Sequence, residues 1–386
     1  MTITDVSGLD PDRLAHLLAV MEEDAKTDLY FGGVVVAARH GEVGLHAAFG
    51  HADPGRTRVV KTDSVFSVFS VTKALTNTLV LRAIELGQLG LTTRASDVIP
   101  EFSGGLRETV TVHHMLTHST GIPSVYEAKP GAYIDRLDEV IADICANVHS
   151  EVEPGTRVDY APMVSHALMG EMVRRLDPKG RSYRALVQQE IFDPLGMTDS
   201  AIGLRKDLQP RHLRPEPRGN FAMDHKGRSD LGPNGAFEEE DAEMPWVGAA
   251  STAWDFHRFA EMLRRGGELD GKRILSPTIL KRARQNQTGE KPNEVYKRLC
   301  EANGWPIIPA YLGLGFPLRG TAFGNHYYGT LSTPETLGAY GAGTTLIWVE
   351  PELDMTFVCF TTGVMAPAAN FLRWRRISDI AISAAV

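Results

Sequence analysis

The sequence of 386 residues predicts a mixed α/β (α+β) fold: an antiparallel sheet built from both chain ends, flanked by helices, with an inserted, mainly helical subdomain. Two observations predict this class. Apolar segments with strand character cluster near the two termini, and segments with helical periodicity fill the middle of the chain. A hydrophobic content of 43% and a charged content of 23% are those of an ordinary globular chain.

The N-terminal part predicts a helix, a strand hairpin and a second helix. Leucine and methionine recur at helical spacing over residues 11–26, with Asp10 as a candidate cap. The run GVVVAA at residues 33–38 predicts a buried strand, and residues 42–51 predict its antiparallel partner after a turn at His40-Gly41. The second helix follows Ser70 and ends near Gly87.

The middle of the chain predicts helices, and the C-terminal part returns to strands. Helical patterns cover residues 135–148, 164–176, 183–192, 254–266 and 276–285. Residues 203–245 are rich in Pro, Gly and charge, which predicts a long irregular segment that forms an active-site wall. Strands at residues 344–349 and 355–360 precede a closing helix over residues 366–385. We therefore expect residues 1–90 and 335–386 to form the sheet subdomain and residues 91–334 the helical one, as one intimate unit.

Composition excludes several classes of partner. The net charge of −8 and the lack of a Lys/Arg-rich stripe argue against nucleic acid, and the local cluster Arg211, Arg214 and Arg218 predicts a loop. Three widely spaced cysteines do not suggest a disulfide framework. The chain contains no apolar stretch long enough for a bilayer and begins without a signal-like segment, so we expect no membrane partner and a cytoplasmic location. The sequence does not determine the oligomeric state.

The most informative motif is Ser70-Val71-Thr72-Lys73, which follows an apolar run and opens the second helix. Residues three apart lie on one helix face, so the hydroxyl and the amine are neighbours. An ammonium lowers the cost of forming the alkoxide, and a neutral amine can take the hydroxyl proton itself. The helix N-terminus adds partial positive charge at Ser70. The tetrapeptide alone fits equally an N-cap serine with a solvated lysine; its sequence context favours a nucleophile.

That context resembles the serine β-lactamase-fold superfamily on its class C side, which includes class C β-lactamases, D-alanyl-D-alanine carboxypeptidases and family VIII carboxylesterases. The resemblance covers residues 30–200 and 335–386. It is carried by residues 66–91, residues 110–122 (VTVHHMLTHSTGI), Pro154-Gly155 leading to Tyr160, residues 193–197 (DPLGM) and the last two strands. It implies a β-lactamase/transpeptidase-like fold, with Ser70 as the nucleophile, Lys73 as its partner, and neither metal nor cofactor.

The second motif of that superfamily, Tyr-x-Asn, matches Tyr160-Ala161-Pro162, which retains the tyrosine and loses the asparagine. A neighbouring ammonium favours the phenolate of a tyrosine. We therefore expect Tyr160 to relay the Ser70 proton and later to activate water. The alternative is an ordinary loop tyrosine with a bonded hydroxyl.

The third motif, Lys-Thr-Gly or a variant, matches Ala339-Tyr340-Gly341; a shift of one residue puts Tyr340 in the lysine place. Neither alignment supplies a basic residue. The resemblance places the oxyanion hole at the backbone N–H groups of Ser70 and Ala342, which survive side-chain changes. Tyr340, Gly341 and Pro162 are candidate substrate-binding residues, while residues 340–343 could instead form a simple glycine-rich strand entry.

These departures favour an esterase. In β-lactamases and DD-peptidases the asparagine holds the substrate amide and the lysine meets its carboxylate, which Pro162 and Ala339 cannot do. Family VIII esterases often carry an apolar residue in the asparagine place. We predict a serine hydrolase that cleaves a small-molecule carboxylic ester through an acyl-Ser70 intermediate. The alternatives are a transacylase with an alcohol or amine acceptor, a β-lactamase or D-alanyl-D-alanine carboxypeptidase, and a non-catalytic binding protein.

Other patterns carry less information. The sequence lacks Gly-x-Ser-x-Gly, Walker A and Rossmann motifs. His114 and His118 are four residues apart, but Met115 stands where a zinc motif has glutamate, so we expect no metal site. Four aromatic residues are candidates for the pocket lining or, alternatively, for the core: Trp246, Trp305, Tyr327 and Tyr328.

Overall fold

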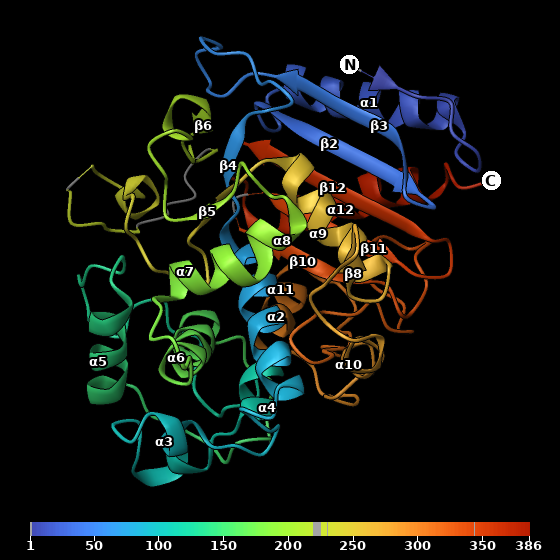
Figure 1. Ribbon diagram of the computed structural model, residues 1–386. Helices are drawn as coiled ribbons and strands as arrows, with labels where there is room; N and C mark the ends of the chain where they lie inside the picture. Colours follow the sequence, from blue (N-terminus) through green and yellow to red (C-terminus); the bar gives the residue numbers. More distant parts are fainter. Residues whose placement is uncertain (1, 219–224, 230, 343) are drawn as a thin grey trace.

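The computed structural model describes residues 2–218, 225–229, 231–342 and 344–386, and its main sheet joins the two chain ends (Figure 1). The six strands of this sheet are antiparallel neighbours in the order β1 (Thr2–Ile3), β3 (Glu42–Gly50), β2 (Gly32–Arg39), β12 (Met355–Thr362), β11 (Thr345–Glu350) and β10 (Leu337–Gly341). At the centre, β2 pairs with β12 from Gly32–Thr362 to Arg39–Met355. The predicted antiparallel sheet from both chain ends is thereby confirmed.

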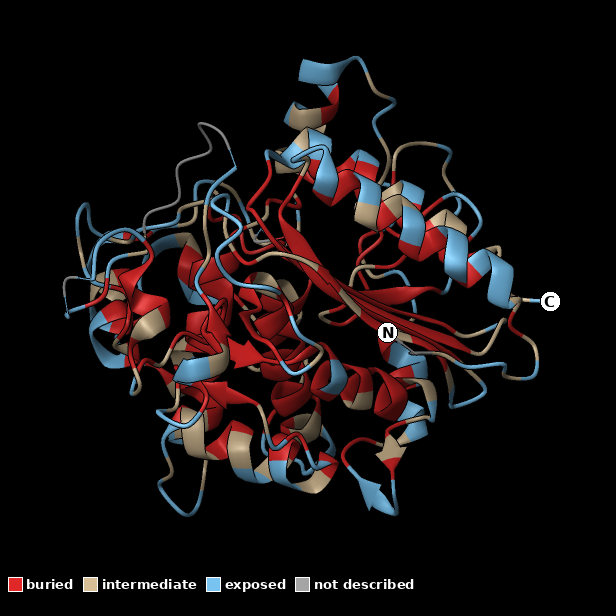
Figure 2. Ribbon diagram, turned by 90° about the horizontal axis from the view of Figure 1, so that it is seen from above, coloured by how far each residue is buried: buried red, intermediate tan, exposed pale blue. Residues whose placement is uncertain are grey.

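Both faces of this sheet are buried, as the unbroken apolar run in β2 indicates. Val34 and Val36 belong to one hydrophobic cluster, and Val35 and Ala37 to another on the opposite face. The helices α1 (Pro11–Lys26) and α12 (Pro367–Ile382) pack together and supply the second cluster. The helix α9 (Ala253–Arg264) covers the other face, and Figure 2 shows the buried sheet between these layers.

The helical part surrounds α2 (Thr72–Glu85), which packs on α6 (Pro162–Arg175) and is almost wholly buried. The short turn η1 (Phe69–Val71) leads into α2. The other helices and turns are α3 (Ala95–Val98), η2 (Gly105–Thr109), α4 (Val112–Leu116), α5 (Leu137–Asn147), α7 (Tyr183–Val187), η3 (Gln188–Phe192), α8 (Asp193–Leu195), η4 (Gln209–Arg211), η5 (Gly235–Glu238), α10 (Pro277–Ala283) and α11 (Glu294–Asn303). A small sheet has the order β5 (Ala201–Ile202), β7 (Ala249–Ser251), β4 (Val65–Ser67), β6 (His212–Leu213), and β8 (Glu268–Leu269) pairs with β9 (Lys272–Arg273).

Most predicted elements occur within a few residues of their predicted ends. The helix predicted over residues 183–192 is instead the short α7 followed by the π-helical turn η3. Two of the elements that were not predicted, β10 and α11, border the site described below. In β10 (LGAYG) glycine weakens the strand signal, and α11 (EVYKRLCEAN) has few apolar residues to show a period. The subdomain boundaries at residues 90 and 334 stay a prediction; α2 packs on the helical part, and α9 packs on the sheet.

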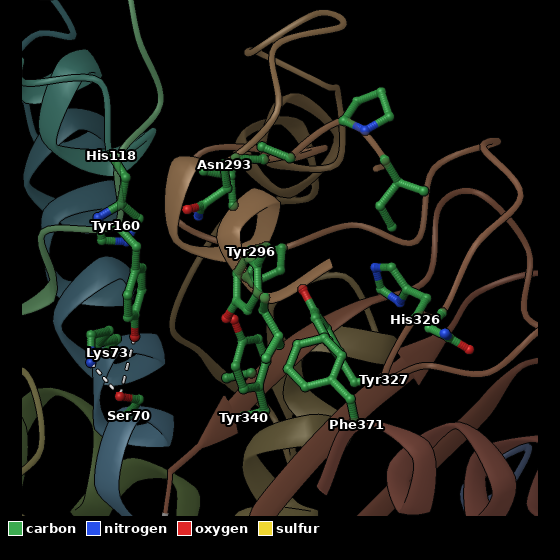
Figure 3. Close-up of a pocket in the computed structure, with 18 of the residues that line it drawn as sticks. Ser70, Lys73, His118, Tyr160, Asn293, Tyr296, His326, Tyr327, Tyr340 and Phe371 are labelled. Atoms are coloured by element: carbon green, nitrogen blue, oxygen red, sulfur yellow. Dashed lines mark hydrogen bonds between the residues drawn. The ribbon is translucent and has the colours of Figure 1, made fainter. Parts of the chain in front are cut away.

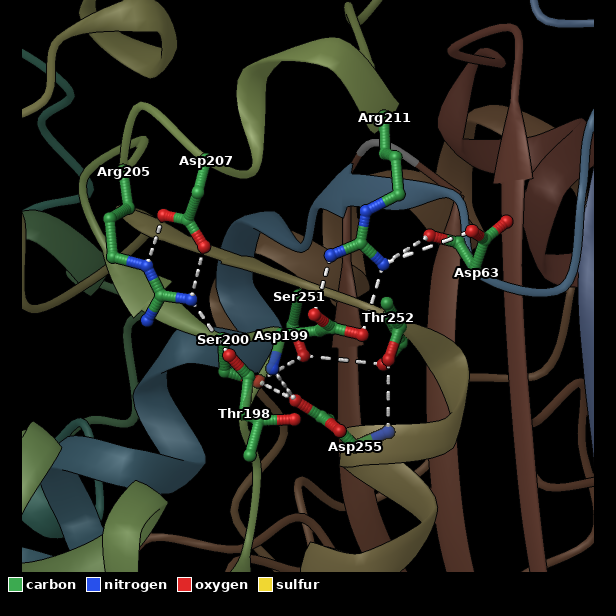
Figure 4. Close-up of polar contacts among 10 residues, drawn as sticks. All are labelled: Asp63, Thr198, Asp199, Ser200, Arg205, Asp207, Arg211, Ser251, Thr252 and Asp255. Carbon is green, nitrogen blue, oxygen red and sulfur yellow. Dashed lines mark hydrogen bonds and ion pairs between the residues drawn. The ribbon is translucent and has the colours of Figure 1, made fainter.

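A polar network fastens the segment after α8 to the start of α9 (Figure 4). The buried carboxylate of Asp255 accepts hydrogen bonds from the Ser200 hydroxyl and the Asp199 N–H, at 2.7 and 2.8 Å. Its burial nevertheless raises the pKa of Asp255 to about 6. Asp199 in turn accepts from Arg211 at 3.0 Å. Because the Arg211 guanidinium is already paired with Asp199, Arg211 does not form part of an anion-binding patch.

Two further findings concern the chain as a whole. All three cysteines, Cys145, Cys300 and Cys359, are free thiols. Within the described ranges, none of the helices is both long and apolar enough to cross a bilayer.

Candidate active site

Ser70 lies in the turn η1, between β4 and α2, on a backbone that other elements hold in place. The preceding Phe69 has a φ of +49°, a left-handed conformation that a non-glycine residue adopts at some cost. The Phe69 ring packs edge-on against Phe237 at 4.9 Å, and the Val68 carbonyl accepts a hydrogen bond of 2.8 Å from the Thr345 hydroxyl. Ser70 is not a helix N-cap, since α2 begins at Thr72 and no side chain caps it. The N-cap interpretation of the motif is therefore wrong.

The structure brings Ser70, Lys73 and Tyr160 together, as Figure 3 shows. Lys73 Nζ lies 2.6 Å from Ser70 Oγ and donates to the Trp246 carbonyl at 2.8 Å. The Tyr160 hydroxyl donates to Ser70 Oγ at 3.2 Å. Tyr160 comes from the loop just before α6, so two helices and one loop converge on one serine oxygen.

Burial sets the protonation of this group. Lys73 is only 6% exposed and has no carboxylate partner among the described residues, so desolvation lowers its pKa well below the usual range of lysine. Desolvation also raises the pKa of Tyr160, and its hydrogen bond to Ser70 offsets this only in part. The site therefore favours a neutral amine and a protonated phenol. The ammonium-stabilised Tyr160 phenolate expected from the sequence is not what this environment favours.

Two buried histidines, His118 and His166, pack beside the site and are neutral. The His118 ring packs on Tyr160 at 4.7 Å between ring centroids, and His166 lies 5.5 Å from His118. Burial, assisted by repulsion from Lys73, lowers the pKa of His118 to about 3 and that of His166 well below its usual value. His166 is held by Asn77 and by the Pro162 carbonyl, each at 3.1 Å.

The end of β10 lies against the serine turn. A Cβ atom on Gly341 would be 2.7 Å from the Val68 carbonyl oxygen and 2.9 Å from the Phe69 Cβ, so only glycine permits this approach. Ala342 follows the last paired residue of β10 and is exposed, and Gly343 lies outside the described residues. The N–H of Ser70 is in the first turn of η1, where helices leave donors without intrahelical partners. Both N–H groups thus belong to backbone segments that border the site.

A pocket opens beside Ser70, with an empty volume of about 900 Å³ that includes its open mouth. Ala339 and Tyr340 both line it, and Tyr340 supplies the ring. The other two predicted substrate-binding residues, Gly341 and Pro162, do not line the pocket. Gly341 lets β10 approach the serine turn, and Pro162 is the buried first residue of α6. Of the four candidate aromatic residues, Trp305 and Tyr327 line the pocket. Tyr328 is buried and does not, and Trp246 contributes its carbonyl to Lys73.

The walls of the pocket come mainly from residues 293–327, and none of the described part of residues 203–245 lines it. That segment instead supports the serine turn through Phe237; residues 219–224 and 230 lie outside the described residues. Several lining residues escaped the sequence reasoning, among them Asn293, Tyr296, His326 and Phe371. Tyr296 and Phe371 lie on helices of ordinary pattern, and only the dense aromatic content of residues 323–328 was visible as a signal.

The fold and the site are those of the β-lactamase-type serine hydrolases. The chain belongs to the Beta-lactamase family, whose sequence pattern matches residues 19–382. It is 30% identical to penicillin-binding protein 4 of Amycolatopsis lactamdurans over 264 residues, which is 65% of this chain and 66% of that protein. It is 27% identical to esterase EstB of Burkholderia gladioli over 308 residues, 71% of this chain and 75% of the esterase. A crystal structure of a family VIII carboxylesterase superposes with a TM-score of 0.76 at 21% identity, covering 99% of this chain and 100% of that one.

Proposed function

We propose that this protein hydrolyses uncharged carboxylic esters through an acyl-Ser70 intermediate. The observation that carries the proposal is the contact of Ser70 Oγ with a buried, unpaired lysine amine at 2.6 Å and a tyrosine hydroxyl at 3.2 Å. A similar esterase in Burkholderia gladioli supports the choice of substrate class.

In the acylation step, Ser70 Oγ attacks the ester carbonyl carbon while the neutral Lys73 amine takes its proton. The Trp246 carbonyl holds one Lys73 N–H, which leaves the amine lone pair directed to Ser70. The N–H groups of Ser70 and Ala342 stabilise the oxyanion of the tetrahedral intermediate. These reaction steps need neither a metal nor a cofactor.

Collapse of the intermediate breaks the bond to the alcohol oxygen, and Tyr160 supplies the proton that the leaving alkoxide takes up. The Lys73 ammonium then returns its proton to Tyr160, so the net transfer is from Ser70 to the alcohol. Water attacks the acyl-enzyme with the same groups acting in reverse. Tyr160 is thus assigned as an acid in acylation. A phenolate would instead act as a base in that step.

The lining of the pocket argues against substrates that need an anchored carboxylate. Within the described part of the chain, the residues that border it include no arginine, and Lys73 is the one lysine among them. That lysine contacts Ser70 and is buried. A β-lactam or a peptide terminus would bring a carboxylate into this pocket without a counter-ion, at a large desolvation cost.

Intact-protein mass spectrometry tests this proposal. Wild type and Ser70→Ala are exposed to 4-nitrophenyl butyrate and to a serine-reactive fluorophosphonate. We expect a single adduct on wild type and none on the variant, with slow or no turnover of a cephalosporin reporter. An equal adduct on Ser70→Ala would overturn the assignment of the nucleophile, and rapid cephalosporin turnover would overturn the choice of substrate.

A further inference from the structure

Four aromatic rings from different elements form one wall of the pocket, across from Ser70 and Tyr160 (Figure 3). They are Tyr296 of α11, Tyr327, Tyr340 of β10 and Phe371 of α12. The centroids of Tyr327 and Tyr340 lie 4.2 Å apart, and those of Tyr296 and Phe371 lie 5.3 Å apart. Since three separate elements and a loop fix these rings, they form a rigid surface on which the flat face of a ring can pack.

The three tyrosines of this wall carry hydroxyls that the described protein leaves unpaired. Other buried tyrosines of the chain do have partners: Tyr183 bonds the Thr76 hydroxyl at 2.6 Å, and Tyr328 donates to the Pro317 carbonyl at 3.4 Å. The hydroxyls of Tyr296, Tyr327 and Tyr340 are neither bonded to described residues nor sealed away from the pocket space. Tyr327 is buried, and Tyr296 and Tyr340 are half-buried. Their hydroxyls border the pocket without a protein partner, so three such groups in one wall indicate a ligand that supplies acceptors.

Asn293 adds a fourth free donor beside this wall. Its Oδ1 accepts the Val295 N–H at 3.0 Å, which caps α11 and leaves the Nδ2 group without a partner in the described structure. The residue is only 4% exposed and lines the pocket. An amide fixed in this way offers N–H groups to a bound molecule.

The lining also lacks fixed charge. Among the described residues that border the pocket there is no Asp, Glu or Arg, and the one lysine among them is held by Ser70 and Trp246. His326 is buried, and its pKa is lowered well below the usual range of histidine by desolvation, so it is neutral. Donors without charge select neutral oxygen acceptors over carboxylates or phosphates, which would stay uncompensated.

We propose that this wall is a subsite for the alcohol part of the ester, and that it selects an uncharged, ring-containing alcohol bearing several oxygen atoms. The inference rests on the proposed function. The alcohol part is favoured because Tyr160, which supplies the leaving-group proton, borders the same pocket as Tyr327 and Tyr340 (Figure 3). A simple alkyl or hydrocarbon alcohol would cover the three hydroxyls and the amide without supplying acceptors, and donors that are desolvated without a partner disfavour such a ligand.

The test compares two bicyclic aryl acetates, 4-methylumbelliferyl acetate, whose ring system carries lactone oxygens, and 1-naphthyl acetate, whose ring system carries none. The kcat/KM ratio of the two esters is measured for wild type, for each single variant Tyr296→Phe, Tyr327→Phe and Tyr340→Phe, and for the triple variant. Comparing the ratio between variants cancels the different acidity of the two leaving groups. Tyr328→Phe is the matched control, because it removes a neighbouring buried hydroxyl that does not line the pocket.

We expect at least one single variant to lower the ratio about three- to tenfold, the effect of one lost hydrogen bond between neutral groups, and the triple variant to lower it further. Tyr328→Phe should leave both the ratio and the activity unchanged. A triple variant that hydrolyses both esters with the wild-type ratio would overturn the subsite and leave the proposed esterase intact. Wild type that cleaves neither ester and forms no adduct at Ser70 would overturn the proposed function, and the subsite with it.

Discussion

Burial of single side chains decides the chemistry at Ser70. A lysine three residues after a serine is compatible with a solvated ammonium, yet Lys73 points into the protein between Ser70 and the Trp246 carbonyl. Without a carboxylate partner, its amine is disfavoured as a cation, and the same environment keeps Tyr160 protonated. The proposed base and acid follow from desolvation, which disfavours the charged form of both side chains and so lowers the pKa of Lys73 and raises that of Tyr160.

Tyr160→Phe tests the assignment of the acid. An alkoxide needs a proton to leave, whereas 4-nitrophenolate leaves readily without one. We therefore expect kcat/KM, which reports the acylation step, to fall by about 10²–10⁴-fold for an alkyl ester and much less for the matched 4-nitrophenyl ester, measured in steady-state assays. Tyr183→Phe, which removes a buried hydroxyl bonded to Thr76, should change neither rate. Equal losses for both esters would show that Tyr160 acts as the base.

At the scale of elements, the site depends on how closely β10 approaches η1. Gly341 makes this approach possible, and Thr345 of the neighbouring β11 fastens the Val68 carbonyl. The strand that borders the oxyanion position and the turn that carries the nucleophile are thus one packed unit, although about 270 residues separate them.

Gly341→Ala tests this packing. The new methyl group would meet the Thr345 hydroxyl at 2.4 Å and the backbone of the serine turn, so the strand must move. We expect a loss of about 1–3 kcal/mol in the free energy of unfolding. A fall in kcat of up to about 10²-fold should accompany it, because the Ala342 N–H shifts.

Thermal unfolding and steady-state kinetics measure the two effects. Gly90→Ala is the control, since its neighbours lie at 3.6 Å or more and its φ is not left-handed. Wild-type stability and kcat in Gly341→Ala would contradict the proposed contact.

At the scale of the whole molecule, Lys73, the proposed base, is buried in the protein at a cost in stability. In the unfolded chain Lys73 has the ordinary pKa of 10.5, and in the folded protein this pKa is lower. Between these two values unfolding takes up a proton, so the penalty is large at neutral pH and fades as the pH rises towards 10.5.

Lys73→Met should therefore abolish esterase activity and stabilise the fold. We expect a gain of about 1–4 kcal/mol near neutral pH, the range seen when buried charged groups are replaced by apolar ones. The gain should shrink as the pH is raised from 7 towards 10, as measured by denaturant unfolding at several pH values. The exposed Lys61→Met should show neither effect. A gain independent of pH would mean that the pKa of Lys73 is not lowered by folding.

The sequence by itself determined the fold and pointed to the candidate reacting residues, because both leave local patterns. The apolar run in β2 predicts a strand buried on two faces, and Ser70, Lys73 and Tyr160 occur in recognisable local motifs. Only the tertiary structure decided their protonation, since desolvation of Lys73 depends on residues as distant as Trp246. The aromatic wall also depends on the tertiary structure. Tyr296, Tyr340 and Phe371 lie on elements that come together when both chain ends join one sheet, and no local sequence pattern indicates this contact.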